Sequence, residues 1–536
     1  MNALFFVFIT AVLFFAAYRF YGRVLENLWQ VNAQRPTPAF TKFDGIDYVP
    51  AKKWMVLFGH HFASIAGAGP IVGPVLATVL WGWGPTMIWI VLGTIFIGAV
   101  HDFGALMTSV REQGASVAAI CEATISKRAK IIFSCFVLLA LILVVAVFAY
   151  LCAQTFVKEP KIVLPSLGLI PVAVLVGLLL YRFKVNSFSA TVIGLVGLTL
   201  LIIAGNFFPV NLGNNSFIIW LVVLFIYSYI ASVAPVNILL QPRDYLSSFL
   251  LFFGMLLGYI GLFLKPALID APFYRQWTTQ EGSLWPFMFV VVACGAISGF
   301  HSLIAGGTTS KQIANERHAK RVAYGAMIAE GLLAVLALIA ASQVIKGSLN
   351  PVITLREIGP IAFFAQGYGM ITSSFLGGSG AFIAIIILNA FILTTLDSAT
   401  RIARYITEEV SGIKNRFFTS FLVVGLSAAL AFSGKWTKIW TIFGTANQLV
   451  AGLTMMILVS WLLINKKKVA FILIPAIFML ATSLAALLWQ GIQSFNQNNF
   501  LILFITTALF VLALYMIKEV IIWKKNLLSK NMAVHP

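Results

Sequence analysis

The sequence has little charge. Only 10% of its 536 residues are Asp, Glu, Lys or Arg, whereas roughly 25% is usual in a soluble globular protein. Cysteine is also scarce: the chain has four, no two of them form a CxxC pair, and all four are interpreted as small apolar fillers. The sequence has no Walker phosphate-binding loop, no HExxH zinc motif and no nucleophile elbow. These absences argue against a soluble enzyme, and we expect no catalytic residue and no metal site.

Hydrophobic residues are abundant, at 60% of the chain. Apolar runs of about 20 residues recur, which is the length that a helix needs to cross the roughly 30 Å hydrocarbon layer. The ten-residue alternation of a membrane β-barrel is absent, and the first run has no basic residue before it and is interpreted as a span, not a signal peptide. The sequence therefore predicts an all-α polytopic membrane protein with about fifteen spans. They are expected near residues 3–20, 54–80, 84–109, 130–153, 163–181, 187–208, 217–240, 245–264, 285–305, 321–345, 379–403, 415–432, 437–465, 468–490 and 500–522.

Lys and Arg outnumber Asp and Glu by 36 to 17, so the net charge is +19. The basic residues fall in separate loops between the apolar runs, not on one soluble face, and we expect no nucleic-acid binding. Cytoplasmic loops of membrane proteins collect Lys and Arg. Applied to alternate loops, this rule predicts an N-terminus outside and a C-terminus in the cytoplasm.

Two further apolar segments are predicted not to cross the bilayer. The segment 360–375 is short and is interrupted by polar residues and glycines. Counting it as a span would also put the basic residues of segment 401–416 outside, against the charge rule. It is interpreted as a re-entrant hairpin. Residues 114–125, on the cytoplasmic side, are a similar piece.

The motif GHHFASIAG at residues 59–67 has an echo, GFHSLIAG, at residues 299–306. Seven spans separate the starts of the two spans that hold these motifs, and this odd number relates the two copies by inversion. Inverted repeats with broken helices are typical of secondary transporters. We predict a five-plus-five inverted-repeat core (LeuT-like) with extra helices, as in the amino acid, polyamine and cation transporter superfamily. The expected units are 1–50 (an extra span and a basic loop), 51–210 (first repeat), 211–280 (two inserted spans), 281–466 (second repeat) and 467–536 (two spans and a basic tail).

Several longer phrases carry a resemblance to one family. They are KKWMVLFGHHFASIAGAGPIVGPVLA, AVHDF, QPRDYLSSFLL, LWPFMFVVVACGAISGFHSLIAGGTTSKQ, LNAFILTTLDSATRIARYITEE and FGTANQLVAG. Together they cover roughly residues 50–460, and they resemble the carbon starvation protein A family. This resemblance implies uptake of peptides or pyruvate across a bacterial inner membrane.

Ionisable residues inside the apolar runs are the first candidates for function, because they are costly at membrane depth. His60 and His61 lie about seven residues beyond Lys53, roughly 10 Å into the membrane at 1.5 Å per residue. Asp102, on the next and oppositely directed span, lies at the same depth. We expect its carboxylate to pair with one of the two histidines and to hold a coupling proton; a purely structural pair is the alternative.

Glycine and proline at residues 67–70 predict a helix break followed by a restart. A half-helix that begins there attracts an anion such as a substrate carboxylate; Gly73 fits the break and close helix packing equally well. The echo would supply the facing half of the cavity, or its glycines mark where the span leaves the membrane. The predicted substrate-binding residues are His60, His61, Gly67, Ala68, Gly69, His301, Gly306, Gly307 and Thr308.

The segment TTLDSAT, residues 394–400, places hydroxyls and a carboxylate in one apolar helix. In the superfamily plan this helix faces the first broken helix and completes a sodium site, or its aspartate carries a proton. The alternative is a helical ion pair between Asp397 and Arg401 or Arg404. The predicted ion-coupling residues are Asp102, Thr394, Thr395, Asp397 and Ser398.

These residues predict a symporter that imports a small carboxylate-bearing nutrient, either pyruvate or a short peptide, with protons or sodium by alternating access. Its expected partners are that substrate, the coupling ion and the lipid bilayer, and no cofactor is expected. The alternatives are a haem- or quinone-linked membrane redox protein and a passive channel. Adjacent histidines point about 100° apart on a helix, which argues against their sharing one metal.

Overall fold

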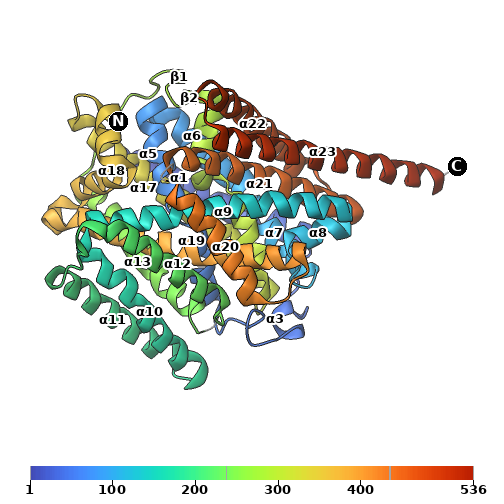
Figure 1. Cartoon of the computed structure of the whole chain (residues 1–536), viewed down its shortest axis with the longest axis horizontal. Coiled ribbons are helices and arrows are strands. Elements are labelled where there is room, and N and C mark those ends of the chain that lie inside the picture. Colours follow the sequence, from blue (N-terminus) through green and yellow to red (C-terminus); the bar gives the residue numbers. More distant parts are fainter. Residues whose placement is uncertain (1, 237, 434–435, 535–536) are drawn as a thin grey trace.

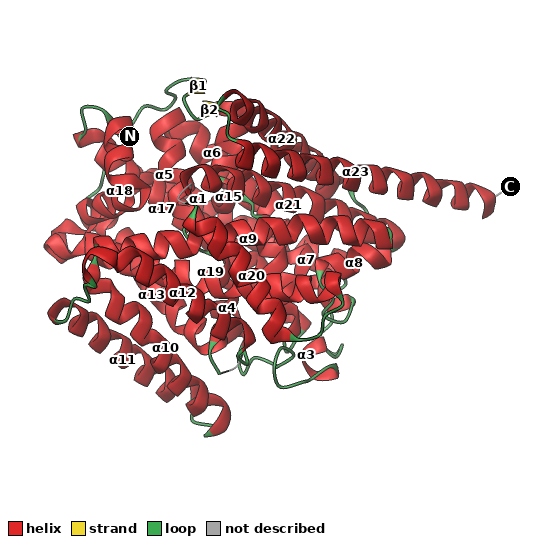
Figure 2. Ribbon diagram, in the orientation of Figure 1, coloured by secondary structure: helices red, strands yellow, loops and turns green. Residues whose placement is uncertain are grey.

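The computed structural model of the chain describes residues 2–236, 238–433 and 436–534. Figure 2 shows that the described chain is almost entirely helical. Its strands are β1 (Thr278–Thr279) and β2 (Gly282–Ser283), which form a short antiparallel pair in a loop. The expected all-α class is confirmed.

Thirteen helices precede the strand pair. They are α1 (Ala3–Ala16), α2 (Gly22–Leu28), α3 (Pro38–Thr41), α4 (Trp54–Ile65), α5 (Gly69–Trp81), α6 (Trp83–Gly93), α7 (Ala99–Arg111), α8 (Val117–Thr124), α9 (Lys127–Lys158), α10 (Val163–Gly177), α11 (Ser187–Phe207), α12 (Ser216–Val233) and α13 (Leu240–Leu264). Ten follow it. They are α14 (Phe289–Val291), α15 (Ala293–Ala296), α16 (Gly299–Gly307), α17 (Gly325–Gly347), α18 (Pro351–Leu376), α19 (Gly380–Ser411), α20 (Arg416–Phe432), α21 (Trp436–Ile464), α22 (Ala470–Asn496) and α23 (Phe500–Val534).

Short π-helical and 3₁₀ turns connect or extend these helices. The π-helical turns are Ala17–Tyr21, Thr94–Gly98, Leu178–Arg182, Leu284–Met288 and Lys320–Tyr324. The 3₁₀ turns are Pro160–Ile162, Gly213–Asn215, Thr309–Lys311, Glu316–His318 and Gly377–Ser379. Polar caps start several of the helices: Ser116 accepts from the amide of Ala119 at the start of α8, and Ser126 accepts from the amide of Ala129 at the start of α9.

Twelve helical segments of the described chain are long and apolar enough to cross a membrane. They include Ala3–Leu28, Trp83–Arg111 and the 32-residue α9, and α18 and α19 together form a single apolar segment, Pro351–Ser411. The bent pair α4 and α5 meets the same test when its two halves are taken together. The chain is therefore a multi-pass membrane protein, and the count of fifteen spans stays a prediction.

The helices pack in two sets of matching contacts around the long helices α9 and α19, which lie against each other. In the first set α4 packs on α13 and α12 on α9; in the second α16 packs on α21 and α20 on α19. Equivalent contacts made by two sets of helices are what an inverted repeat would produce.

The pair α10 and α11 lies outside this arrangement, at the edge of the molecule in Figure 1. The two helices pack mainly on each other and on α13. By contrast, α12 contacts α9, α19 and α20, and α13 contacts α4, α18 and α19. The predicted division, which put residues 163–208 in the first repeat and treated 211–280 as an insertion, stays a prediction. Hydropathy alone does not distinguish the members of four consecutive apolar helices.

The two segments predicted to be re-entrant occupy equivalent positions in the chain. Residues 117–124 form α8 between α7 and α9, and α18 lies between α17 and α19. Gly359 has φ 81° and ψ 162°, so α18 bends sharply there, a conformation that favours glycine. The piece α8 packs on α16 and α21, while α18 packs on α5 and α13. Their re-entrance stays a prediction.

Candidate functional site

The first broken helix consists of α4 and α5. Helix α4 ends at Ile65, Ala66 leaves the helical conformation, and α5 restarts at Gly69 at 43° to α4 with Pro70 in its first turn. Proline suits that turn because its missing N–H costs no hydrogen bond there. The predicted break is therefore present.

Hydroxyl groups of α19 hold the broken end of α4. The Thr394 hydroxyl donates to the carbonyl of Ala63 at 2.7 Å, and that of Thr395 donates to the carbonyl of Ser64 at 3.3 Å. The hydroxyls of Ser64 and Ser398 are 3.0 Å apart. Helix ends leave carbonyls unpaired, and these contacts satisfy two of them while joining α4 to α19.

The second break lies at residues 297–298, where Ile297 and Ser298 are extended between α15 and α16. Asn447 of α21 caps the new helix, because its Oδ1 accepts from the amide of Phe300 at 2.9 Å and from the Ser298 hydroxyl at 3.1 Å. Of the two interpretations left open for the glycine pair, the structure does not support the break, because Gly306 and Gly307 are the last residues of α16. That the span leaves the membrane there stays a prediction.

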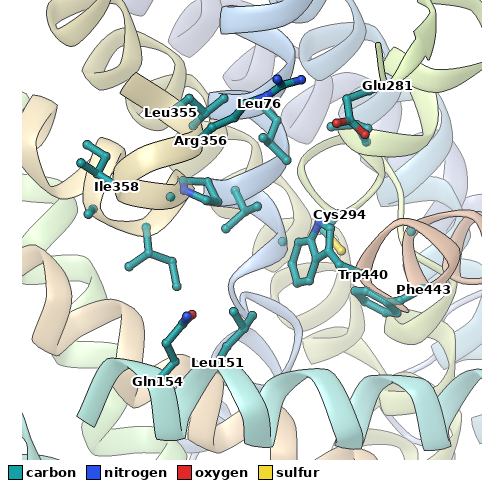
Figure 3. Close-up of a pocket in the computed structure, with 18 of the residues that line it drawn as sticks. Leu76, Leu151, Gln154, Glu281, Cys294, Leu355, Arg356, Ile358, Trp440 and Phe443 are labelled. Carbon is teal, nitrogen blue, oxygen red and sulfur yellow. The ribbon is translucent and has the colours of Figure 1, made fainter. Parts of the chain in front are cut away.

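A cavity of about 660 Å³ lies beside both breaks. Gly69, Cys294 and Asn447 line it near the breaks, and side chains of α9, α18 and α21 complete its wall. Figure 3 shows Gln154 and Leu151 rising from α9 toward the cavity, with Trp440 and Cys294 at one side. Three of its charged lining residues stand at a helix end or in a loop, and two lie in the short part of α18 before the bend at Gly359. In that order they are Lys158, Glu159, Glu281, Arg356 and Glu357.

Close packing brings the two broken helices together at this cavity. A Cβ atom on Gly69 would lie 2.4 Å from the Cys294 sulfur, and one on Gly73 would lie 2.3 Å from the carbonyl oxygen of Val291. Both glycines thus let α5 approach α14 and α15. For Gly73 the structure supports the packing interpretation.

A buried chain of four ionisable side chains crosses from α7 to α17 through α16. One carboxylate oxygen of Asp102 lies 2.8 Å from Nδ1 of His101, and the other lies 2.9 Å from Nδ1 of His301. His301 Nε2 is 3.3 Å from a Glu330 oxygen. All four side chains are fully buried. We define these four residues as the acid–histidine chain.

The predicted pairing of Asp102 with His60 or His61 was therefore wrong. His60 Nδ1 is 2.7 Å from Asp244 of α13, and its other ring nitrogen is 3.3 Å from the Gln312 amide. His61 Nδ1 is 2.8 Å from the Thr309 hydroxyl. Consecutive residues of a helix point in different directions, and packing gave the two histidines different partners.

Asp397 is held by groups that the sequence interpretation did not connect with it. The Arg243 guanidinium contacts its carboxylate, and the Tyr227 hydroxyl donates to the same oxygen at 2.5 Å. The side chains of Arg243 and Asp397 are 2% and 1% exposed. The alternative pair with Arg401 or Arg404 is not observed, because both arginines turn to the loop before α4.

That loop is tied to α19 through Asp47. Its carboxylate is 2.9 Å from Arg401 and 3.8 Å from Arg404, and the Tyr405 hydroxyl donates to it. Burial alone would raise the pKa of Asp47, but Arg401 and Lys311 hold this pKa below its ordinary value. Lys311 Nζ also lies 4.1 Å from the centre of the Tyr405 ring. We define these contacts as the Asp47 clamp.

Comparison with known proteins identifies the family of the chain. The family described as carbon starvation protein CstA matches residues 2–353 and 343–486. The chain belongs to the carbon starvation protein CstA family. The peptide transporter CstA of Escherichia coli K12 is 32% identical over 91% of this chain and 81% of that protein. The pyruvate/proton symporter BtsT of the same organism is 30% identical over 93% of this chain and 82% of that protein.

The fold is also found among solved structures. A manganese transporter of Eremococcus coleocola, 12% identical, aligns over 90% of this chain and 99% of that chain with a TM-score of 0.50. This CstA-family chain is thus a transporter and not an enzyme. The redox alternative finds no support among these relatives.

Within this CstA-family chain, the predicted substrate residues are divided between the cavity and its surroundings. Gly69 lines the cavity, whereas a Cβ on Gly67 would meet Thr395 and Phe148. The others are buried in the packed interior, either within α4 or α16 or shortly after one of these helices. They are His60, His61, Ala68, His301, Gly306, Gly307 and Thr308.

The sequence interpretation missed several residues of the CstA-family site. Glu330 is an acid within an apolar span, a signal that could have identified it. Arg243 was counted only as a loop charge, although it is buried, and Asp244 and His101 appeared only inside family phrases. Asn447, which belongs to the phrase FGTANQLVAG, caps α16 and lines the cavity.

Proposed function

We propose that this protein is a proton-coupled symporter that imports pyruvate or a short peptide across the bacterial inner membrane by alternating access. The observation that carries the proposal is the acid–histidine chain, which reaches α16 three residues after the second break. The charge rule puts the N-terminus outside and the C-terminus in the cytoplasm. On this topology the cavity opens outward.

The acid–histidine chain is suited to binding one proton. Neither oxygen of Glu330 has a hydrogen-bond partner among the described residues, and a buried carboxylate without such partners is costly unless it is neutral or faces a cation. A proton on Glu330 or on His301 meets that need. His301 belongs to the half-helix α16. Movement of α16 would therefore change both the access of water to the acid–histidine chain and the affinity of this chain for a proton.

The α4–α19 joint supports protons over sodium as the coupling ion. Sodium would need oxygen ligands, since a hard cation prefers hydroxyl and carbonyl oxygens. The hydroxyls of Thr394 and Thr395 and the α4 carbonyls are ligands of this kind. These hydroxyls already donate to those carbonyls, however, and Arg243 already neutralises Asp397. The relative named as a pyruvate/proton symporter agrees with proton coupling.

The start of α5 is the proposed site of the substrate carboxylate. A helix N-terminus attracts anions, no side chain caps α5, and its first residue, Gly69, lines the cavity. Gln154, Trp440 and Asn447 would contact the rest of the substrate. A volume of about 660 Å³ admits a short peptide as well as pyruvate.

Three layers of contacts lie on the cytoplasmic side of this cavity in the proposed topology. They are the pair His60–Asp244, the pair Arg243–Asp397 and the Asp47 clamp. Each joins α4, or the loop before it, or α13 to a neighbouring helix. We propose that opening toward the cytoplasm separates α4, α13 and α19 from one another and breaks these contacts.

Uptake into proteoliposomes tests the proposed function. Radiolabelled pyruvate and, separately, dialanine are offered under an imposed inward proton gradient without sodium, with wild type, Asp102→Asn and Asp270→Asn. Asp270 pairs with Lys346 in an exposed position and provides the matched control. Gradient-driven uptake that only Asp102→Asn loses supports the proposal. Equal, gradient-independent flux in all three would indicate a passive channel, and a strict sodium requirement would overturn proton coupling.

A further inference from the structure

A second cavity, of about 500 Å³, lies beside the contact between α4 and α13. Its wall comes from the π-helical turn after α1, the start of α4, the first half of α13, the π-helical turn before α17 and the start of α17. Its lining residues are Tyr18, Trp54, Met55, Phe58, Tyr245, Ser248, Phe249, Phe252, Arg321, Gly325 and Ile328. We define this cavity as the aromatic groove.

The groove is apolar along its length and cationic at one end. Phe58 and Phe252 stack with their ring centres 5.8 Å apart, and Phe252 and Met55 remain 37% and 48% exposed. Arg321 lies at the end nearest the basic loop, and its guanidinium is 5.3 Å from the centre of the Trp54 ring. A surface of this kind matches a molecule with an apolar chain and an anionic head.

Arg321 has no carboxylate partner within salt-bridge distance among the described residues, unlike its neighbour. Lys320 is paired with Glu26 at 2.5 Å, whereas the contacts of Arg321 are the Trp54 ring and the nearby Tyr18. A cation beside apolar surface, without a counter-ion from the protein, favours an anion from outside. Basic pockets between membrane helices at the cytoplasmic side are typical sites for anionic lipid heads.

The lining residues lie in the parts of their spans that adjoin basic segments of the chain. Trp54 starts α4 directly after the basic loop, and Arg321 and Gly325 lie at the start of the span that follows the basic segment 311–321. Tyr18 lies toward the inner end of the first span, next to Arg19 and Arg23. By the charge rule these parts lie in the cytoplasmic leaflet.

We propose that the aromatic groove binds one anionic phospholipid of the cytoplasmic leaflet, with an acyl chain along the aromatic rings and the phosphate at Arg321. The groove is built on α4, which carries His60, and on α13, which carries Asp244. A bound lipid therefore contacts both sides of the His60–Asp244 joint. A free phosphate would use only Arg321, and an apolar peptide would use only the rings; a phospholipid uses both.

Native mass spectrometry of the full chain in detergent tests this site. The protein receives phosphatidylglycerol or phosphatidylcholine with identical acyl chains, and the retained lipid is counted for wild type and three variants. Arg321→Gln removes the charge. Gly325→Leu fills the groove, since a Cβ at Gly325 meets only ordinary contacts, at 3.6 Å or more. Arg23→Gln is the matched control, because Arg23 is an exposed arginine of the following helix α2 and does not line the groove.

We expect wild type to retain one phosphatidylglycerol about five-fold more tightly than phosphatidylcholine, the preference that one basic residue gives at an anionic membrane surface. Arg321→Gln should abolish this preference, Gly325→Leu should weaken retention of both lipids, and Arg23→Gln should change neither. Size-exclusion profiles identify any variant that fails to fold. Unchanged retention in a folded Arg321→Gln, an equal loss in Arg23→Gln, or displacement of the lipid by inorganic phosphate alone would overturn the proposal.

Discussion

Asp102 and His301 are 199 residues apart in the chain, yet Oδ2 of the aspartate lies 2.9 Å from Nδ1 of the histidine. The same carboxylate reaches His101 through its other oxygen. It therefore links α7 to the half-helix α16, and any movement of α16 against α7 disturbs a buried charge. This contact connects the position of a broken helix to a proton.

Glu330→Gln should separate transport from proton coupling. The amide keeps the size of the side chain but cannot bind or release the proton, so we expect gradient-driven uptake to fall about 100-fold or more, the usual scale for loss of a positioned proton-transfer group. Exchange of labelled for unlabelled substrate should persist. Uptake and exchange in proteoliposomes provide the measurement, with the partly exposed Glu122→Gln as control. Full gradient-driven accumulation in Glu330→Gln would contradict a role for Glu330.

Arg243 and Asp397 should depend on each other for stability. Removing one member of a buried ion pair leaves an uncompensated charge, which costs about 3–5 kcal/mol. Arg243→Met and Asp397→Asn should each lower the thermal midpoint of the purified protein clearly. The double variant should lower it by less than the sum of the two changes. Tryptophan fluorescence during heating measures all four proteins, and strictly additive shifts would show that the pair is not coupled.

Gly73→Ala should weaken the contact between the two broken helices. The new methyl group would lie 2.3 Å from a backbone oxygen of Val291, and overpacking of this kind typically costs about 1–3 kcal/mol. Gly425→Ala is the matched control, because a Cβ there meets nothing within 4 Å. It should leave stability unchanged or improve it by up to about 1 kcal/mol through helix propensity. Thermal midpoints that fall equally in the two variants would refute this packing argument.

Cys294 should be reachable from the cavity. Its side chain lines the cavity, whereas Cys121 and Cys152 are buried. A membrane-impermeant mercurial added outside right-side-out vesicles should modify wild type and not Cys294→Ser. Bound substrate should slow the reaction. Modification only after the reagent enters the vesicle lumen would reverse the proposed direction of opening.

The Asp47 clamp should make stability depend on pH. A carboxylate whose pKa lies below its ordinary value in the folded chain contributes stability above that ordinary value, and this contribution is lost as the pH falls through the lower, folded value. Asp47→Asn should therefore melt at a lower temperature than wild type near about pH 7. The gap should narrow as the pH falls below the ordinary aspartate value of about 3.9. A gap that stays constant over this range would exclude the ionised carboxylate as its cause.

Local signals were sufficient for much of the architecture. Runs of about 20 apolar residues identify membrane helices because no other backbone arrangement except a closed barrel satisfies its hydrogen bonds in lipid. Glycine and proline located the break before Gly69 for a similarly local reason. In the echo the same signal failed, since its glycines end α16, and the break at residues 297–298 contains no proline and depends on a cap from Asn447, on another helix.

By itself, the sequence determined that this protein is a helical membrane transporter of the CstA family with a broken helix near Gly69. Those properties follow from hydropathy, helix-breaking residues and family phrases, all of which are readable along a few neighbouring residues. Only the tertiary structure decided that Asp102 pairs with His301, that Asp397 pairs with Arg243, and that α12 and α13 pack on α19 while α10 and α11 pack mainly on each other and on α13. These pairings depend on which helices pack together, although the paired residues are more than a hundred positions apart in the chain. The sequence of an apolar helix does not show which other helix of similar hydropathy packs against it.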